Sequence, residues 1–235
     1  LGRFELVRDG VPVKSGGKAQ QRVLDLLKAI VAFGPRGAAS DTIASALWPA
    51  SDGDAAQTAL DVTLHRLRKL LGLEGAVVVA DGRIALNPRC CWVDAFAFEQ
   101  ALDACERDGG ELAEAERALG LYAGHFLQGD EETPWLLPRR ERLRSKFLRC
   151  VERCGATREE RGEHPAAVEL YRRALEVDPL AEGVYRNLMA AYLAAGRRAE
   201  ALEAYRRCRH MLSVVLGVPP SAETEAMRAR VSANR

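Results

Sequence analysis

The chain has 235 residues, of which 48% are hydrophobic and 29% are charged, and its formal net charge is +1. This length is sufficient for two small domains, each with its own core. No apolar run approaches the roughly 18 residues that span a bilayer, so the sequence argues against a membrane-spanning protein. A net charge this close to zero predicts nothing about nucleic acid, and a DNA-binding site would have to be a local patch.

The cysteines favour unreactive thiols over a metal or disulfide framework. Six cysteines are present, at positions Cys90, Cys91, Cys105, Cys150, Cys154 and Cys208. They form no paired CxxC framework, and the chain is too long and too helical for a disulfide-stapled miniature domain. Cys150 and Cys154 stand one helical turn apart and could share a metal, but no second His or Cys pair lies within sequence reach. Buried thiols in the reducing cytoplasm are the favoured interpretation.

The first predicted element is a β-hairpin. Apolar residues recur along residues 1–7, Asp9 and Gly10 follow, and Val11 and Val13 continue the pattern. Asp-Gly between two apolar runs is a strong hairpin signal. Because this strand-like stretch already begins at Leu1, we expect the sequence to be a piece of a longer chain.

Two helices are predicted next. A helical period of apolar residues covers residues 23–31 and stops at the turn-forming residues 34–37. Ser40 is predicted to be the N-cap of a shorter helix that ends at Pro49. A loop then covers residues 50–53.

The third predicted helix covers residues 54–71. Leu60, Leu64, Leu67 and Leu71 recur at i, i+4, i+7 and i+11, which is the spacing of one apolar stripe. Gly72 follows as a C-cap. This helix should therefore pack its leucines inward and expose its opposite face.

A second hairpin completes the first domain. Apolar runs at residues 77–79 and 84–86 flank Asp81 and Gly82. Hairpin, three helices and hairpin is the order of a winged helix-turn-helix. We predict that this domain covers residues 1–91 and that a linker covers residues 87–92.

The remainder, residues 92–235, is predicted to be entirely helical and repetitive. The pattern Ala-x-Glu-x-Tyr-Arg-Arg begins at Ala167 and again at Ala201, 34 residues later, and a glycine lies five residues before each copy. A weaker third copy places Gly110 before Ala115. A 34-residue helix-turn-helix period is typical of tetratricopeptide repeats. The predicted fold class is mainly α, a winged helix-turn-helix followed by an all-α tetratricopeptide-like domain.

The face of the third helix opposite its leucines is the candidate DNA-binding surface. It carries hydroxyl, imidazole, apolar and cationic side chains at Thr58, Val62, Thr63, His65, Arg66, Arg68 and Lys69, together with the acidic Asp61. Arg can bind a guanine edge bidentately, and Thr, His and Lys can hold phosphates. Arg83, beside Gly82 in the second hairpin, is predicted to probe a minor groove or a phosphate. The same residues also fit a solvated basic face on a packed helix.

A resemblance to a known family supports the DNA-binding interpretation. Residues 60–71 resemble the recognition helix of OmpR/PhoB-type winged helices. The whole chain resembles regulators of the Streptomyces antibiotic regulatory protein type, in which such a winged helix precedes a bacterial transcriptional activation domain. The motifs of that second domain are Val93-Asp94-x-Phe96, Tyr122-x-Gly124-x-Phe126-Leu127, Trp135, Arg140-Glu141-x-Leu143, Leu188-Met189-x-x-Tyr192, Gly196-Arg197-x-x-Glu200-Ala201-Leu202 and Leu216-Gly217-Val218-Pro219-Pro220.

The resemblance implies roles for residues of the third helix. It implies that Arg66 and Arg68 reach bases or their flanking phosphates, and that Thr63 and His65 contact phosphates. Val62 would contact a thymine methyl group.

The resemblance also implies protein partners. A loop would meet RNA polymerase at its sigma subunit, through Trp48, Pro49, Ser51, Asp52 and Gly53. The activation domain would serve as a scaffold for partners and self-association, so a homodimer and paired binding to direct repeats are expected. No membrane partner is expected.

No enzyme signature competes with this interpretation. Residues 15–18 are the only phosphate-loop-like stretch, but Pro12 stands where a P-loop needs its first Gly, and Ala19 replaces the required Ser or Thr. The four histidines have no HExxH or triad-like setting. The sequence therefore predicts no catalytic residue, no metal and no cofactor.

The predicted function is that of a sequence-specific, DNA-binding bacterial transcription regulator in the cytoplasm, an activator that recruits RNA polymerase. The alternative is a protein-interaction or signal-coupling module of a larger regulator that does not itself bind DNA. The nearly neutral first domain and a hairpin without the Gly-Tyr pair common in the family favour this alternative. A steep loss of affinity with salt would distinguish the DNA binder.

Overall fold

The computed structural model describes residues 1–13, 18–107 and 112–233. The chain forms two compact units, Leu1–Ala97 with Phe126–Leu143 and Phe98–His125 with Arg144–Arg235. The units are interleaved along the chain, and one division falls within helix α6 (Leu137–Glu160). The domain boundary after residue 91 therefore stays a prediction about the sequence. Among the described residues, no helix has both the length and the apolar character to cross a membrane.

The first unit begins with the predicted hairpin. Strand β1 (Val7–Arg8) pairs antiparallel with β2 (Val11–Pro12). Asp9 and Gly10 form the turn with φ angles of 50° and 79°, the left-handed pair that a two-residue hairpin needs. The regular strand is shorter than predicted: before it, Gly2 forms an isolated parallel bridge to Phe126.

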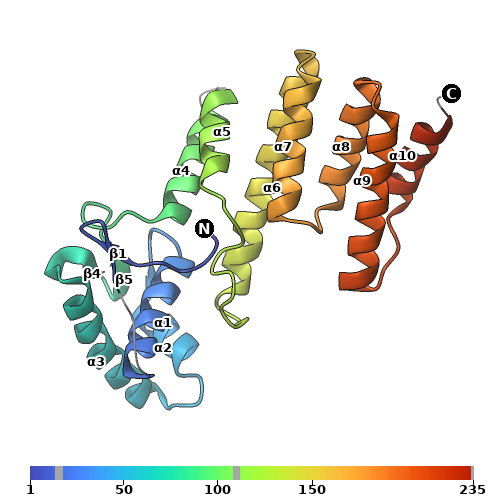
Figure 1. Cartoon of the computed structure of the whole chain (residues 1–235). Coiled ribbons are helices and arrows are strands. Elements are labelled where there is room, and N and C mark those ends of the chain that lie inside the picture. The colour runs from blue at the N-terminus through green and yellow to red at the C-terminus, as the bar shows by residue number, and fades with distance from the viewer. Residues whose placement is uncertain (14–17, 108–111, 234–235) are drawn as a thin grey trace. The chain divides into compact units, whose positions relative to one another are not determined.

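Three helices make the core of the first unit. They are α1 (Lys18–Ala32), α2 (Ser40–Leu47) and α3 (Gly53–Leu71) (Figure 1). The apolar residues that set the predicted helical period are buried, among them Val23, Leu26, Leu27, Ile30, Ile43, Leu47, Leu60, Leu64 and Leu67. As predicted, α3 ends at Gly72, which adopts a φ of 73° and donates its N–H to the carbonyl of Arg68.

A three-stranded sheet follows α3. After a 3₁₀ turn η1 (Glu74–Ala76), β4 (Val77–Ala80) and β5 (Arg83–Leu86) form the second predicted hairpin, with Asp81 and Gly82 at its tip. A third strand, β3 (Ala38–Ala39), pairs with β5, so the order is β3-β5-β4. The sequence did not predict β3, because two alanines carry no alternation. Gly37 permits this close approach, since a Cβ there would lie 1.8 Å from the carbonyl oxygen of Ile84.

The predicted N-cap role of Ser40 is wrong. Ala39 occupies the cap position of α2 and makes no side-chain cap bond. Ser40 instead donates its N–H and its Oγ–H to the carbonyl of Gly82, at 2.9 and 3.0 Å. The pairing of β3 with β5 brings the hairpin tip to the start of α2, where it competes with helix capping for this hydroxyl.

The prediction that all residues after Val93 are helical is wrong for residues 121–136, which form turns and loops. Part of this stretch packs in the first unit. The guanidinium of Arg140 donates to the carbonyls of Phe126 and Leu127, both at 3.0 Å, and the buried Lys28 pairs with Asp130 at 2.5 Å. These long-range polar contacts have no sequence periodicity that would reveal them.

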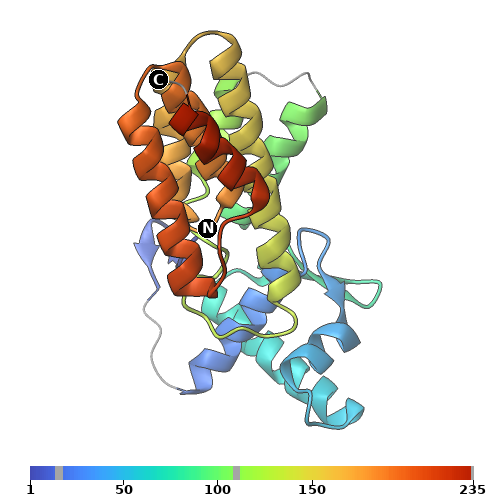
Figure 2. The same cartoon turned by 90° about the vertical axis from the view of Figure 1, so that its right-hand side faces the viewer.

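The second unit is all-α. Its helices are most of α4 (Asp94–Arg107), α5 (Leu112–Gly120), most of α6, α7 (His164–Val177), α8 (Glu182–Ala194), α9 (Arg198–Met211) and α10 (Ala222–Ala233), with a π-helical turn η2 (Leu212–Leu216). Helices α7, α8 and α9 lie side by side (Figure 1), and α10 packs against both α8 and α9 (Figure 2).

The internal repeat corresponds to two helical hairpins, the end of α6 with α7, and α8 with α9. The repeated small residues Ala167 and Ala201 are both fully buried, and the repeated Tyr171 and Tyr205 lie beside them in the core. Small side chains at these positions let neighbouring helices approach closely. The tetratricopeptide-like prediction is confirmed for these copies, while Gly110 of the weaker copy and residues 15–17 of the phosphate-loop-like stretch lie outside the described residues.

Candidate nucleic-acid interface

Helix α3 presents one exposed face, defined here as the α3 outer face by Thr58, Asp61, Val62, His65, Arg66 and Lys69. Val62 is 47% exposed and contributes an apolar group to this face. Within the described part of the chain, the side chains of His65, Arg66 and Lys69 make no hydrogen bond or ion pair. Three cationic or titratable groups are therefore available on this face to an external partner.

Thr63 does not belong to this face, contrary to the prediction. It is only 7% exposed, and its hydroxyl donates to the carbonyl of Ala59 at 2.7 Å. Thr63 stands three residues after Leu60 and four before Leu67, so helical geometry places it on the buried leucine stripe. A phosphate cannot reach its hydroxyl without disturbing the core.

Arg68 is also directed away from the outer face. The residue is half-buried, and its guanidinium donates to the carbonyl of Val77 in β4 at 3.5 Å. This contact ties the end of α3 to the first strand of the second hairpin. Asp61, which could have oriented Arg68, instead accepts a hydrogen bond from Gln57 at 3.3 Å.

Arg83 lies on the second hairpin, but its guanidinium is occupied by backbone. It donates to the carbonyl of Gly37 at 2.7 Å and to that of Arg36 at 3.4 Å. The structure thus places this arginine as a clamp on the turn before β3. Arg36 is exposed, and its side chain has no partner among the described residues. Sequence reasoning missed Arg36 as a candidate phosphate contact because the residue stands between turn-forming glycines.

The predicted polymerase-contact loop connects α2 to α3. Trp48 is half-buried, whereas Pro49, Ser51, Asp52 and Gly53 are exposed. The N–H of Ser51 donates to the carbonyl of Trp48 at 3.1 Å, and the carboxylate of Asp52 accepts the N–H of Ala55 at 2.7 Å. Asp52 is therefore the N-cap of α3, a structural duty that the sequence prediction did not assign to it.

The cysteines offer no site in the part of the chain that the structure describes. All six are free thiols, and Cys105, Cys150, Cys154 and Cys208 are buried. The sulfurs of Cys150 and Cys154 lie 3.9 Å apart. Their mutual hydrogen bond raises the pKa of Cys150 and lowers that of Cys154. No cluster of three or more His, Cys, Asp or Glu side chains suited to a metal occurs among the described residues.

The sequence of the chain is similar to a known protein family and to known regulatory proteins. The family model for the bacterial transcriptional activator domain matches residues 93–232. The regulatory protein AfsR of Streptomyces coelicolor is 31% identical over 238 residues, covering 98% of this chain and 24% of AfsR. AfsR of Streptomyces griseus is 29% identical, and the match covers 94% of this chain and 23% of that protein.

The chain covers a larger share of its mycobacterial relatives. The transcriptional regulatory protein EmbR of Mycobacterium tuberculosis H37Rv is 28% identical over 244 residues, covering 98% of this chain and 62% of EmbR. The solved structure of Mycobacterium tuberculosis EmbR in complex with a low-affinity phosphopeptide has a TM-score of 0.68 at 23% identity, covering 100% of this chain and 64% of that one. This likeness shows a shared fold. The chain spans about a quarter of the AfsR proteins and under two thirds of EmbR.

Proposed function

Because this chain belongs to the bacterial transcription regulators of the Streptomyces antibiotic regulatory protein type, which carry a bacterial transcriptional activator domain, we propose that it binds double-stranded DNA through helix α3. Its relatives are named as regulatory proteins, not enzymes. On this proposal the protein also recruits RNA polymerase and acts in the cytoplasm.

The α3 outer face is the observation that carries the proposal. Helix α3 buries one stripe of leucines and leaves His65, Arg66 and Lys69 exposed and unpaired within the described residues. A major groove admits one α-helix, and its base edges accept hydrogen bonds from a guanidinium. In this arrangement Arg66 reads a base edge or a flanking phosphate, His65 and Lys69 hold phosphates, and Val62 contacts a thymine methyl group.

Polymerase recruitment is proposed for the turn between α2 and α3. Pro49 and Ser51 are exposed there, and neither caps a helix through its side chain. In transcription assays, the double variant Pro49→Ala, Ser51→Ala should retain DNA affinity and lose activation. Loss of both properties together would show that the turn is structural. The second unit would supply contacts between two copies bound at directly repeated sites.

The test of DNA binding begins with in vitro selection from genomic fragments by the whole chain. The selected site is then titrated by fluorescence anisotropy at several salt concentrations. The double variant Arg66→Ala, Lys69→Ala should lose affinity and show a shallower salt dependence, because it releases fewer counterions. Arg22→Ala is the matched control, since Arg22 is exposed on α1 and unpaired within the described residues. Equal affinity of the double variant and the control contradicts the proposal.

A protein-interaction module that does not bind DNA is the second candidate. It is favoured by the backbone contacts of Arg68 and Arg83, which engage two of the predicted DNA-binding cations within the protein. A chain that selects no DNA sequence, and whose partner binding depends little on salt, would support this function.

A further inference from the structure

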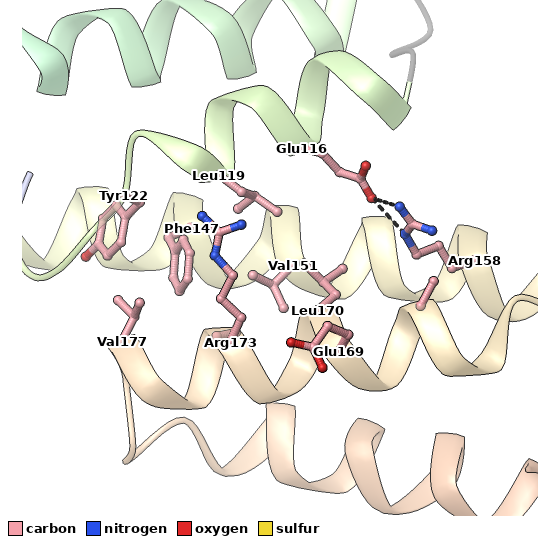
Figure 3. Close-up of a pocket in the computed structure, with 12 residues that line it drawn as sticks. Glu116, Leu119, Tyr122, Phe147, Val151, Arg158, Glu169, Leu170, Arg173 and Val177 are labelled. Atoms are coloured by element: carbon pink, nitrogen blue, oxygen red, sulfur yellow. Dashed lines mark hydrogen bonds and ion pairs between the residues drawn. The ribbon is translucent and has the colours of Figure 1, made fainter.

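The second unit contains a cavity whose lining residues all lie outside helix α3. It has a volume of about 310 Å³ and lies between α5, α6 and α7 (Figure 3). Its walls are largely apolar and include Leu119, Tyr122, Phe147, Val151 and Leu170. The rings of Tyr122 and Phe147 stack with their centroids 4.3 Å apart and their planes 14° apart, which forms a flat aromatic surface.

Two arginines line the cavity, and carboxylates engage only one of them. The guanidinium of Arg158 donates to Glu116 at 2.7 Å and to Glu163 at 3.0 Å. Glu169, which also lines the cavity, pairs with Arg172 outside it at 3.9 Å.

Arg173 is the second of these arginines, and it is exposed. Its side chain has no hydrogen bond or ion pair among residues 1–13, 18–107 and 112–233. Figure 3 shows its side chain extending from α7 toward the residues of α5 and α6 that line the cavity. The guanidinium therefore belongs to the lining of a largely apolar cavity and has its N–H donors available.

The internal repeat explains why space remains beneath this arginine. In the second copy, 34 residues later, Arg207 corresponds to Arg173, and Tyr185 corresponds to Val151. The Tyr185 ring is buried at 1% exposure. Burial raises the pKa of the Tyr185 hydroxyl, and the nearby Arg207 guanidinium partly offsets this. The tyrosine thus fills the space below the second arginine, whereas the smaller Val151 leaves that space open in the first copy.

We propose that this cavity binds a small organic anion with an apolar body, of the class of aromatic or medium-chain carboxylic acids. The carboxylate accepts bidentate hydrogen bonds from Arg173, and the apolar body lies against Tyr122, Phe147 and Val151. The volume is at the lower end of small-molecule sites, which fits a compact ligand better than a peptide helix. Glu169 opposes the anion and limits its affinity.

The ligand class is tested on the whole chain without DNA, so the outcome is independent of the proposed function. Isothermal titration compares 2-naphthoate with the neutral 2-naphthylmethanol, and methyl NMR follows Leu119, Val151 and Leu170. The carboxylate should bind and shift these methyl signals, and the alcohol should bind at least about tenfold more weakly, because it lacks the charge-assisted bonds to Arg173. Equal binding of the two compounds, or no binding of either, overturns the proposal.

Variants locate the site. Arg173→Ala should weaken 2-naphthoate binding about tenfold or more, and Val151→Tyr should block binding by filling the cavity as Tyr185 fills its counterpart. Glu169→Gln should strengthen binding. Arg207→Ala is the matched control, because it removes the arginine at the same repeat position but outside the cavity, and it should leave affinity unchanged.

Two outcomes of the variants contradict the site. Equal effects of Arg173→Ala and Arg207→Ala would show that the arginine over the cavity does not hold the carboxylate. Unchanged affinity in a folded Val151→Tyr variant would show that the ligand binds elsewhere. If circular dichroism shows that Val151→Tyr does not fold, the comparison of Arg173→Ala with Arg207→Ala decides.

Discussion

The arginines of the first unit differ in what their guanidinium groups contact. Arg66→Ala should cost about 1–3 kcal/mol of specific DNA binding and leave the free energy of unfolding unchanged, because the side chain is exposed and unpaired among the described residues. Arg68→Ala should lower the free energy of unfolding by about 0.5–1.5 kcal/mol through the lost bond to Val77. Anisotropy and urea unfolding measure the two effects. An Arg68→Ala chain of full stability that binds no DNA would contradict this division of roles.

Asp52 has a structural role within the predicted polymerase-contact loop. Its carboxylate caps α3 through the N–H of Ala55, so Asp52→Ala should lower the free energy of unfolding by about 1 kcal/mol. The neighbouring Ser51→Ala is the control and should be nearly neutral. Urea unfolding followed by tryptophan fluorescence checks both variants. Equal stability of the two would show that the cap contributes nothing.

Glu182 gives the second unit a pH-dependent contact. Its carboxylate accepts the N–H and the hydroxyl of Ser221 at 2.7 and 2.8 Å. Burial raises the pKa of Glu182, but hydrogen bonds with Thr224 and Ser221 and the charge of Arg186 outweigh burial and hold this pKa below its ordinary value of 4.5.

Because the folded-state pKa is lowered, the stabilisation by Glu182 is fully present above the unfolded pKa and is lost as pH falls through the folded pKa. We expect Glu182→Gln to reduce the free energy of unfolding at neutral pH by less than about 1 kcal/mol, since the group is partly solvated. The difference from wild type should shrink as pH falls below 4.5. Urea titrations from neutral to acidic pH test this, and a difference that grows on acidification would contradict it.

At the scale of the element, the packing of α6 against α7 depends on a missing side chain. A Cβ on Gly155 would lie 2.1 Å from the hydroxyl oxygen of the buried Tyr171. Although alanine favours helices, Gly155→Ala should therefore destabilise the second unit by about 1–3 kcal/mol. Gly120→Ala, at the end of α5 with nothing within 4 Å, is the control and should be neutral or stabilising. Thermal unfolding compares the two, and a stabilised Gly155→Ala chain would refute the packing.

Elements with a strong period were predictable from the sequence. The leucines of α3 and the copies at Ala167 and Ala201 recur at regular spacings, and each Asp-Gly pair stands between two apolar runs. Each of these local patterns favours one type of element. The missed features arise from contacts between distant segments. Strand β3 forms through its pairing with β5, and the non-helical residues 121–136 contact Arg140 and Lys28.

The candidate site shows the same limit. Sequence placed the exposed cations on α3, since the leucine stripe fixes the opposite face. The same spacing could have placed Thr63 on the buried stripe, because it stands three residues after Leu60 and four before Leu67. The directions of Arg68 and Arg83 depend on carbonyls of Val77 and Gly37, which the chain supplies only after the sheet has formed.

At the scale of the whole molecule, the first compact unit combines two separate parts of the chain, Leu1–Ala97 and Phe126–Leu143. Lys28 is 8% exposed, and its partner Asp130 lies outside residues 1–91. The free energy of unfolding of a fragment of residues 1–91 should therefore be lower than that of a fragment of residues 1–143 by about 3 kcal/mol or more, because a buried ammonium loses its partner. The shorter fragment should unfold at a lower urea concentration. Far-UV circular dichroism follows the unfolding of both fragments. Equal midpoints would show that residues 126–143 add no stability to this unit.

The contacts of Ser40 with Gly82 and of Arg83 with Gly37 have a kinetic consequence. These hydrogen bonds connect the hairpin tip to the start of α2 and to the turn before it. The surfaces beside α3 are therefore ordered before the protein meets DNA. Association would then need no ordering step and would proceed at a rate set by diffusion and electrostatic steering. Substitutions on the α3 outer face would alter chiefly the lifetime of the complex with DNA. Substitutions that remove the hydrogen bonds of Ser40 and Arg83 would slow the formation of the complex.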